Sequence, residues 1–180
     1  MHKTISTSIG DLTLVVDDDG AITRLDFGGS GASGNGRATT ARAQDADPAD
    51  GRAQAALDLA ATQLREYLAG ERSAFDLPLR ATGNAFEQLV WAELVRIPYG
   101  ETASYGEIAR RILHPGAARA VGRANARNPI AIVVPCHHVI GSDGSLTGYA
   151  GGLDLKRALL ALEADAVAAA TSASPAAVRR

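Results

Sequence analysis

The sequence of 180 residues contains a single cysteine, Cys136, and only four histidines. One cysteine excludes an internal disulfide and any thiolate-rich zinc site. Of the histidines, only His137 and His138 are close together in the chain, so we expect no bound metal and no other cofactor. The length suits one ordinary domain, or two small domains that share an interface.

Long hydrophobic runs are also missing. No apolar segment approaches the roughly 20 residues that a helix needs to cross a bilayer, and a composition of 46% apolar and 21% charged residues is typical of a globular protein. The first ten residues are polar and lead into the acidic stretch 17–19, which is unlike a signal peptide. We therefore expect a cytoplasmic protein with no membrane partner.

Acidic residues are absent between Ile108 and Ser142. The same segment carries five arginines, at positions 110, 111, 119, 123 and 127. In residues 1–80, by contrast, twelve acidic groups outnumber eight basic ones. The net charge of −2 hides this asymmetry, and the acid-free segment is the part of the chain that could face phosphates.

The first 81 residues predict a small α/β domain. Short strands are expected at 4–9, 12–16 and 21–27, where apolar and β-branched residues are separated by turn signals. Residues 28–51 are rich in Gly, Ala, Ser and Asp without apolar periodicity, which indicates a flexible loop or insertion. Apolar residues recur at helical spacing from Arg52 to Ala69, so one amphipathic helix completes the domain.

Residues 82–164 predict a second, mainly helical domain. Asn84 with Glu87, and Ser104 with Glu107, are capping-box signals that open two helices. The second of these is broken at 114–116 and is followed at once by a helix over 117–127, with three arginines along one side. This pattern indicates a helix-turn-helix, although such helix pairs are common and the arginines also suit a solvated face.

The cysteine follows a β-branched apolar run, Ile130 to Val134, which we expect to be a buried extended segment. Glycine-rich turns come after it, and a last amphipathic helix is expected from Leu153 to Glu163. Residues 165–180 are rich in Ala and Ser and predict a flexible tail.

Two interpretations of Cys136 compete. A lone cysteine after an apolar run is often a small buried hydrophobic residue. Alternatively it is a nucleophile, since a neighbouring histidine such as His137 can lower the pKa of a thiol toward neutrality. The preceding proline, the two histidines and the arginine-bearing helix upstream favour the nucleophile.

At this point several segments resemble one family, the O6-alkylguanine-DNA alkyltransferases, also called methylated-DNA-protein-cysteine methyltransferases. Residues 135–140, Pro-Cys-His-His-Val-Ile, resemble the family's Pro-Cys-His-Arg-Val signature. Further matches in the family's order and spacing fall at 97–109, 117–122, Asn128-Pro129, 147–153 and 156–163. The resemblance is strong over 82–164 and covers the N-terminal domain only in outline.

The resemblance implies an N-terminal α/β unit similar to a ribonuclease-H-like sheet with a helix, and a C-terminal winged helix-turn-helix unit. In this family the helix-turn-helix enters the minor groove of double-stranded DNA, where small side chains permit close approach. Arg119 matches the arginine that fills the space left by a flipped nucleotide, and Arg123 would contact phosphate. The small residues that would allow close approach are Ala117, Ala118, Ala120 and Gly122.

The resemblance also implies the chemistry, which is direct repair of O6-alkylguanine. Cys136 would take the alkyl group, with His137 as its base through a water molecule and Glu163 orienting that histidine. Asn128 would organise the turn and its hydrogen bonds, and Tyr105 would donate a hydrogen bond to a ring nitrogen of the base. Transfer would be irreversible, so each molecule would act once, as a methylated-DNA-protein-cysteine S-methyltransferase.

The expected alkyl pocket is lined by the backbone of Val139 and Ala150 and by the loop of Tyr149. We expect a monomer, and O4-alkylthymine is a second possible substrate. One departure from the family is His138, which stands where the family has arginine and leaves the partner of that side chain open. Three alternatives remain: a protein that recognises lesions without repairing them, a thiol hydrolase, and a helix-turn-helix regulator.

Overall fold

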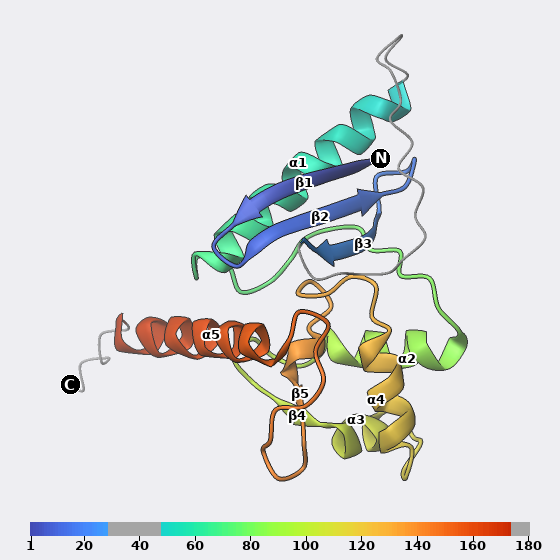
Figure 1. Cartoon of the computed structure of the whole chain (residues 1–180), viewed down its shortest axis with the longest axis vertical. Helices are drawn as coiled ribbons and strands as arrows, with labels where there is room; N and C mark the ends of the chain where they lie inside the picture. The colour runs from blue at the N-terminus through green and yellow to red at the C-terminus, as the bar shows by residue number, and fades with distance from the viewer. Residues whose placement is uncertain (29–47, 174–180) are drawn as a thin grey trace, which may run out of the picture.

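The computed structural model describes residues 1–28 and 48–173, so most of the loop expected at 28–51 lies outside the described residues. Figure 1 shows two units, one made of a small sheet and a long helix, the other of the remaining helices. This arrangement confirms the expected fold class, an α/β unit followed by a mainly α unit. Within the described ranges, no helix combines the length and hydrophobicity needed to span a bilayer.

The N-terminal unit is a three-stranded antiparallel sheet with one helix packed against it (Figure 1). In the middle strand Leu12, Leu14 and Val16 are buried, which is the alternation that buries one face of a sheet. The helix buries an apolar stripe that includes Leu57 and Leu64. The elements are β1 (His2–Thr7), β2 (Gly10–Val16), β3 (Ile22–Phe27) and α1 (Pro48–Leu68).

The outer edge of β3 is where the two units meet. The amide of Ile22 donates to the carbonyl of Pro78 at 2.8 Å, and the amide of Arg80 donates back to Ile22 at 2.9 Å. Further along the strand, the amide of Leu25 donates to the carbonyl of Pro129 at 2.9 Å. These bonds satisfy backbone groups that an open sheet edge would expose, and the bond to Pro129 joins the sheet to the second unit.

The C-terminal unit places helices around a two-stranded parallel ladder. Trp91 donates from its indole nitrogen to the carbonyl of Ala124 at 2.8 Å, which ties the first helix to the arginine-bearing helix. The ladder pairs Ala103 with Val139 and Ser104 with Ile140. The elements are α2 (Ala85–Leu94), β4 (Ala103–Ser104), α3 (Tyr105–Arg111), α4 (Ala118–Ala126), η1 (Cys136–His138), β5 (Val139–Ile140) and α5 (Leu153–Ala173).

The segment before the cysteine differs from the expected extended run. Residues 130–134 form a buried turn in which the amide of Val134 donates to the carbonyl of Ile130 at 2.9 Å and Ile132 has a φ of 71°. Asn128 satisfies the turn, because its side chain donates to the carbonyl of Val134 at 2.7 Å and accepts from the amide of Ile130 at 3.0 Å. β-branched residues are rare at positive φ, so the apolar sequence gave no signal for this turn.

Two helices are longer than expected. α1 begins at Pro48, inside the expected loop, and proline suits the first turn of a helix. α5 continues to Ala173 rather than ending near Glu163, because the following residues are mostly alanine, the strongest helix former. The tail expected to be flexible from residue 165 is therefore helical to residue 173, and residues 174–180 lie outside the described part of the chain.

The capping box at the start of α2 gives a test of local stability. Asn84 accepts a hydrogen bond from the amide of Glu87 at 3.0 Å, and Glu87 accepts from the amide of Asn84 at 2.9 Å. We expect Asn84→Ala to lower the free energy of unfolding by about 1 kcal/mol, measured by urea titration, because the helix loses its cap. Asn84→Ser keeps an acceptor and should retain most of the stability. Equal losses in both variants would contradict a capping role.

Candidate active site around Cys136

Cys136 begins the short 3-10 helix η1, directly after the buried turn. The residue is buried, and its backbone is held on both sides. Its amide donates to the carbonyl of Val134 at 2.8 Å, and its carbonyl accepts a hydrogen bond from the side chain of Asn125 at 3.3 Å. The thiol therefore has a fixed position in the core of the C-terminal unit.

The surroundings of the thiol act on its ionisation in opposite directions. Burial raises the pKa of Cys136, while a hydrogen bond from Asn128 and the charge of Lys156 act to lower it. Lys156 is fully buried, and its Nζ donates to the carbonyls of Val139 at 2.5 Å and Thr147 at 2.7 Å. Burial is the largest of these effects, so the pKa of the resting thiol lies above its ordinary value. Such a thiol needs a base to react.

His137 has the arrangement that such a base requires. Burial lowers the pKa of His137 to about 4, although the hydrogen bond to Glu163 opposes this shift, so the imidazole is neutral at pH 7. Its Nε2 lies 3.1 Å from Oε1 of Glu163 and 3.2 Å from the hydroxyl oxygen of Tyr67. Nδ1 is buried without a hydrogen-bond partner among the described residues. These contacts keep the proton on Nε2 and leave Nδ1 free to accept one.

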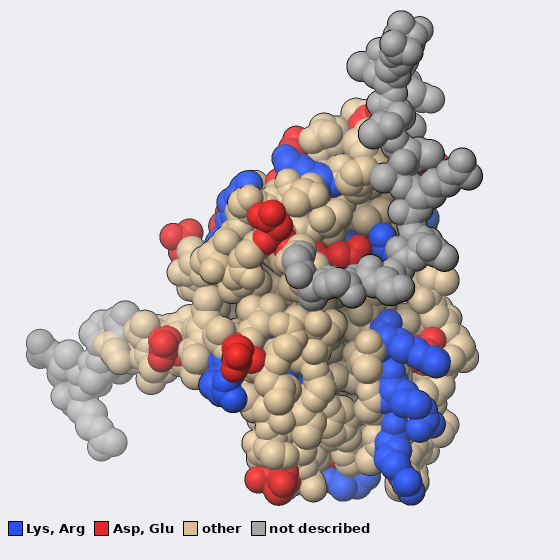
Figure 2. Space-filling view, viewed as in Figure 1, with Lys and Arg blue, Asp and Glu red and all other residues tan. Residues whose placement is uncertain are grey.

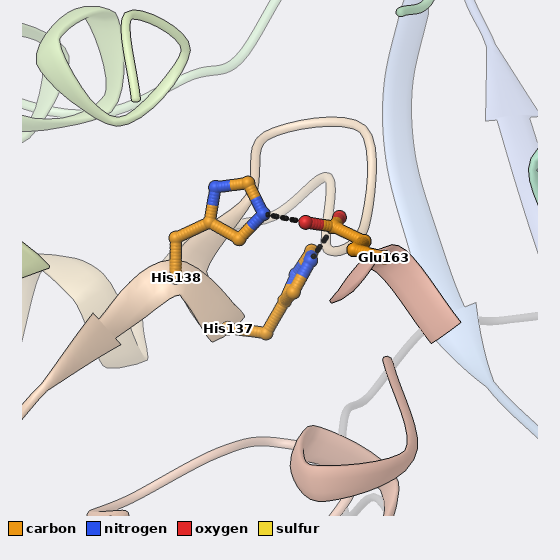
Figure 3. Close-up of side chains that lie close together, drawn as sticks. All are labelled: His137, His138 and Glu163. Carbon is orange, nitrogen blue, oxygen red and sulfur yellow. Dashed lines mark hydrogen bonds and ion pairs between the residues drawn. The ribbon is translucent and has the colours of Figure 1, made fainter. Parts of the chain in front are cut away.

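Glu163 is the centre of this network (Figure 3). Its Oε1 accepts hydrogen bonds from the hydroxyl of Tyr67 at 2.5 Å and from Nε2 of His137. Its Oε2 accepts hydrogen bonds from Nε2 of His138 at 2.7 Å and from the amide of Gly100 at 2.8 Å. Burial alone would raise the pKa of Glu163, but hydrogen bonds from His137, His138 and Tyr67 outweigh it and hold the pKa far below its usual range. The carboxylate is therefore ionised and fully hydrogen bonded.

The partner of His138, which the sequence left open, is Glu163. The imidazole is buried, and it contacts Oε2 of the carboxylate, whereas His137 contacts Oε1 (Figure 3). Its Nδ1 has no hydrogen-bond partner among the described residues. Histidine at this position thus supplies one of the four hydrogen bonds of the carboxylate.

The same three side chains are also the one group in the described residues that could hold a metal ion. One ligand atom each from His137, His138 and Glu163 lie within 4.8 Å of one another. Two imidazoles and a carboxylate are a set that zinc accepts, but here both Nε2 atoms face the carboxylate as hydrogen-bond donors, and a metal would have to displace both protons. The absence of a metal stays a prediction.

A second cluster of expected site residues surrounds a hollow between α3, α4 and the loop after β5. This hollow has a volume of about 630 Å³, and its lining includes Tyr105, Ala118, Arg119, Gly122 and Thr147. The hydroxyl of Tyr105 accepts a hydrogen bond from Thr147 at 3.0 Å. Because β4 pairs with β5, the strand leading into Tyr105 runs beside the strand that follows the cysteine.

The outer face of α4 is positively charged. A stripe of basic side chains runs over this helix (Figure 2). Arg119 and Arg123 are exposed, and no described acidic group lies within ion-pair distance of either. Arg127 pairs with Glu87 at 2.9 Å. The remaining small residues expected to approach DNA, Ala117 and Ala120, lie at the N-cap of α4 and within it.

The three residues expected to line the alkyl pocket lie in different surroundings: two are close to other site residues and one is exposed. The carbonyl of Val139 is occupied by Lys156. The ring centre of Tyr149 lies 6.2 Å from that of His137, and its hydroxyl is buried without a partner among the described residues. Ala150 is exposed on the loop that follows.

Sequence reasoning missed two side chains of the site. Tyr67 belongs to the apolar stripe of α1 and looks like a core residue, and no motif links it to Glu163, 96 positions later. Lys156 had a usable signal, because it lies seven residues before Glu163 and hence on the same face of α5.

The fold and site together define a helix-turn-helix protein with a buried thiol beside a histidine and a carboxylate. Comparison with known proteins identifies the family to which such a protein belongs. Residues 1–81 match the family domain described as 6-O-methylguanine DNA methyltransferase, ribonuclease-like domain, and residues 85–165 match the DNA binding domain of the same family.

Individual relatives agree with these matches. The chain is 64% identical over 104 residues to a methylated-DNA--protein-cysteine methyltransferase of Mycolicibacterium paratuberculosis, which is 58% of this chain and 63% of that relative. It also resembles the crystal structure of Mycobacterium tuberculosis OGT in complex with DNA, with a TM-score of 0.76, 47% identity and coverage of 92% of this chain and 93% of the other. The chain belongs to the O6-methylguanine-DNA methyltransferase family.

The bond between His138 and Glu163 can be tested by its effect on stability. We expect His138→Ala to lower the free energy of unfolding by about 1–3 kcal/mol, because a buried carboxylate loses one of its donors. His138→Gln keeps a donor and should lose less, and His2→Ala, a change at an exposed histidine, is the matched control. Urea titrations that place His138→Ala at the stability of His2→Ala would exclude this contribution.

Proposed function

We propose that this protein repairs DNA by transferring an alkyl group from O6 of guanine to Cys136. The observation that carries the proposal is that the chain's only cysteine directly precedes His137, whose Nε2 contacts Glu163 while Nδ1 has no hydrogen-bond partner among the described residues. Membership of the methyltransferase family supports it. A protein that only recognises lesions would have no use for this thiol and its base.

The helix-turn-helix supplies the surface for DNA. The small residues Ala118, Ala120 and Gly122 on α4 allow a close approach to the minor groove. The basic stripe over this helix would lie along the phosphates (Figure 2). A solved relative, the Mycobacterium tuberculosis OGT, is described in complex with DNA, which favours double-stranded DNA as the partner of this chain.

The reaction requires the damaged base to leave the helix. An O6 substituent lies within the stacked bases, where a protein sulfur cannot reach it in line. The flipped nucleotide would enter on the side of the hollow lined by Tyr105 and Arg119, and Arg119 would fill the space that the base leaves in the helix. Tyr105 would donate its hydroxyl proton toward a ring nitrogen of the leaving guanine.

The proposed reaction is a single nucleophilic displacement at the alkyl carbon. His137 takes the thiol proton at Nδ1 through a water molecule, and the sulfur attacks the alkyl carbon. The carbon–oxygen bond breaks, and guanine keeps the electron pair and takes a proton from Tyr105, which is restored through solvent as His137 releases the proton that it took from the thiol. The products are guanine and a thioether on Cys136. A thioether is stable in water, so each protein molecule is consumed by one transfer.

Intact-protein mass spectrometry tests this function. After mixing with a duplex oligonucleotide that contains O6-methylguanine, the protein should gain one methyl group, and peptide mapping should place it on Cys136. The amount of guanine formed should not exceed one per protein molecule, because the chemistry offers no route back to the thiol.

Cys136→Ala is the control, and it should bind the same duplex without gaining mass. A repeated turnover by the wild-type protein would favour a hydrolase, while binding without transfer would favour a lesion-recognition protein. The monomeric state, the cytoplasmic location and activity on O4-alkylthymine remain predictions.

A further inference from the structure

Tyr67 is the one residue of the N-terminal unit with a hydrogen bond to the network around Glu163 among the described residues. It lies near the end of α1 and is 2% exposed. Its hydroxyl donates to Oε1 of Glu163 at 2.5 Å, and the hydroxyl oxygen of Tyr67 lies 3.2 Å from Nε2 of His137. A side chain from one unit thus contacts both the proposed base, His137, and its carboxylate partner, Glu163, in the other unit.

The direction of these hydrogen bonds follows from the donors present. Glu163 is ionised and can only accept, so the hydroxyl hydrogen of Tyr67 is directed to the carboxylate. The lone pairs of the hydroxyl oxygen then face Nε2 of His137, which has a second acceptor in Oε1 of Glu163 at 3.1 Å. Two acceptors around Nε2 favour the tautomer with the proton on that nitrogen, and Nδ1 is left as the basic atom.

We propose that Tyr67 is a positioning residue for the base of the alkyl-transfer reaction, acting through His137 and Glu163. The inference rests on the proposed function of Cys136. It gives the N-terminal unit a direct part in thiol activation, because the C-terminal unit alone supplies no equivalent hydroxyl to Oε1 of Glu163 among the described residues.

Packing alone explains the ring of Tyr67 but not its hydroxyl. The centre of its ring lies 5.1 Å from that of Phe75 and 5.9 Å from that of Tyr99. A phenylalanine ring at this position could make the same two contacts. Tyr99 shows the contrast, since its own hydroxyl is buried without a hydrogen-bond partner among the described residues. The two neighbouring tyrosines therefore form a matched pair, one with its hydroxyl in the network and one without.

The groups that face His137 determine the expected effect on pH dependence. Glu163 and Lys156 face it from α5, and His138 from the next position in η1. Tyr67 faces it from α1, and Tyr149 from the loop before α5. Removing the hydroxyl of Tyr67 leaves the carboxylate one donor short, so Glu163 stabilises the protonated imidazole more strongly. The acid limb of the pH–rate profile reports the protonation of the base, and it should therefore move to higher pH.

The test compares Tyr67→Phe with Tyr99→Phe in single-turnover transfer of a methyl group from an O6-methylguanine duplex. For Tyr67→Phe we expect a rate about tenfold lower at neutral pH and an acid limb at higher pH, because the tautomer and orientation of His137 are less well fixed. Tyr99→Phe makes the same chemical change next to it and should keep the rate and the pH profile of the wild type. Thermal unfolding of both variants shows whether each is folded.

A measurement on the unmodified protein complements the variants. Long-range ¹H–¹⁵N spectra of the imidazoles should show His137 with its proton on Nε2 at neutral pH. A proton on Nδ1, or a Tyr67→Phe variant with the rate and acid limb of Tyr99→Phe, would overturn the inference. Failure of the wild-type protein to accept a methyl group would instead overturn the proposed function.

Discussion

The site depends on the hydrogen bonds that satisfy the buried carboxylate of Glu163. A charged group in the core is tolerated only when its oxygens are hydrogen bonded, and here the four donors come from Tyr67, His137, His138 and the amide of Gly100. These donors lie on α1, on η1 and in the loop after α2, while Glu163 itself lies on α5. The complete set of hydrogen bonds to this carboxylate therefore requires both units to be folded and docked.

The same burial that makes the carboxylate costly also determines how the thiol can react. Removal of Cys136 from water raises its pKa, and the opposing effects of Asn128 and Lys156 are smaller. A neutral, buried thiol is protected from unspecific alkylation and oxidation. In the proposed mechanism it becomes a nucleophile only when a substrate is in place and His137 takes its proton, which would suit a protein that reacts once.

Most secondary-structure elements could be predicted from local sequence patterns. The side-chain contacts of the site could not, because they join segments that are distant in the sequence. Capping residues and apolar periodicity act over a few positions, so the three strands and most helices were found, although the first strand lies two residues earlier than expected, at His2–Thr7. The pairing of His137 with Glu163 came only from the family resemblance. Tyr67 could not be found, because an apolar helical stripe does not show which hydroxyl meets a partner across an interface. The turn at 130–134 was missed because Asn128 stabilises a positive φ at Ile132, against the preference of that residue.

The most direct test of the central claim is a titration of the thiol itself. Cys136 is the only cysteine, so the ultraviolet absorbance of the thiolate, taken as a difference from Cys136→Ser, reports one group. If activation depends on His137 during the reaction, the resting protein should show no thiolate at neutral pH and should ionise above the ordinary range of cysteine. A thiolate already formed at neutral pH would contradict this mechanism.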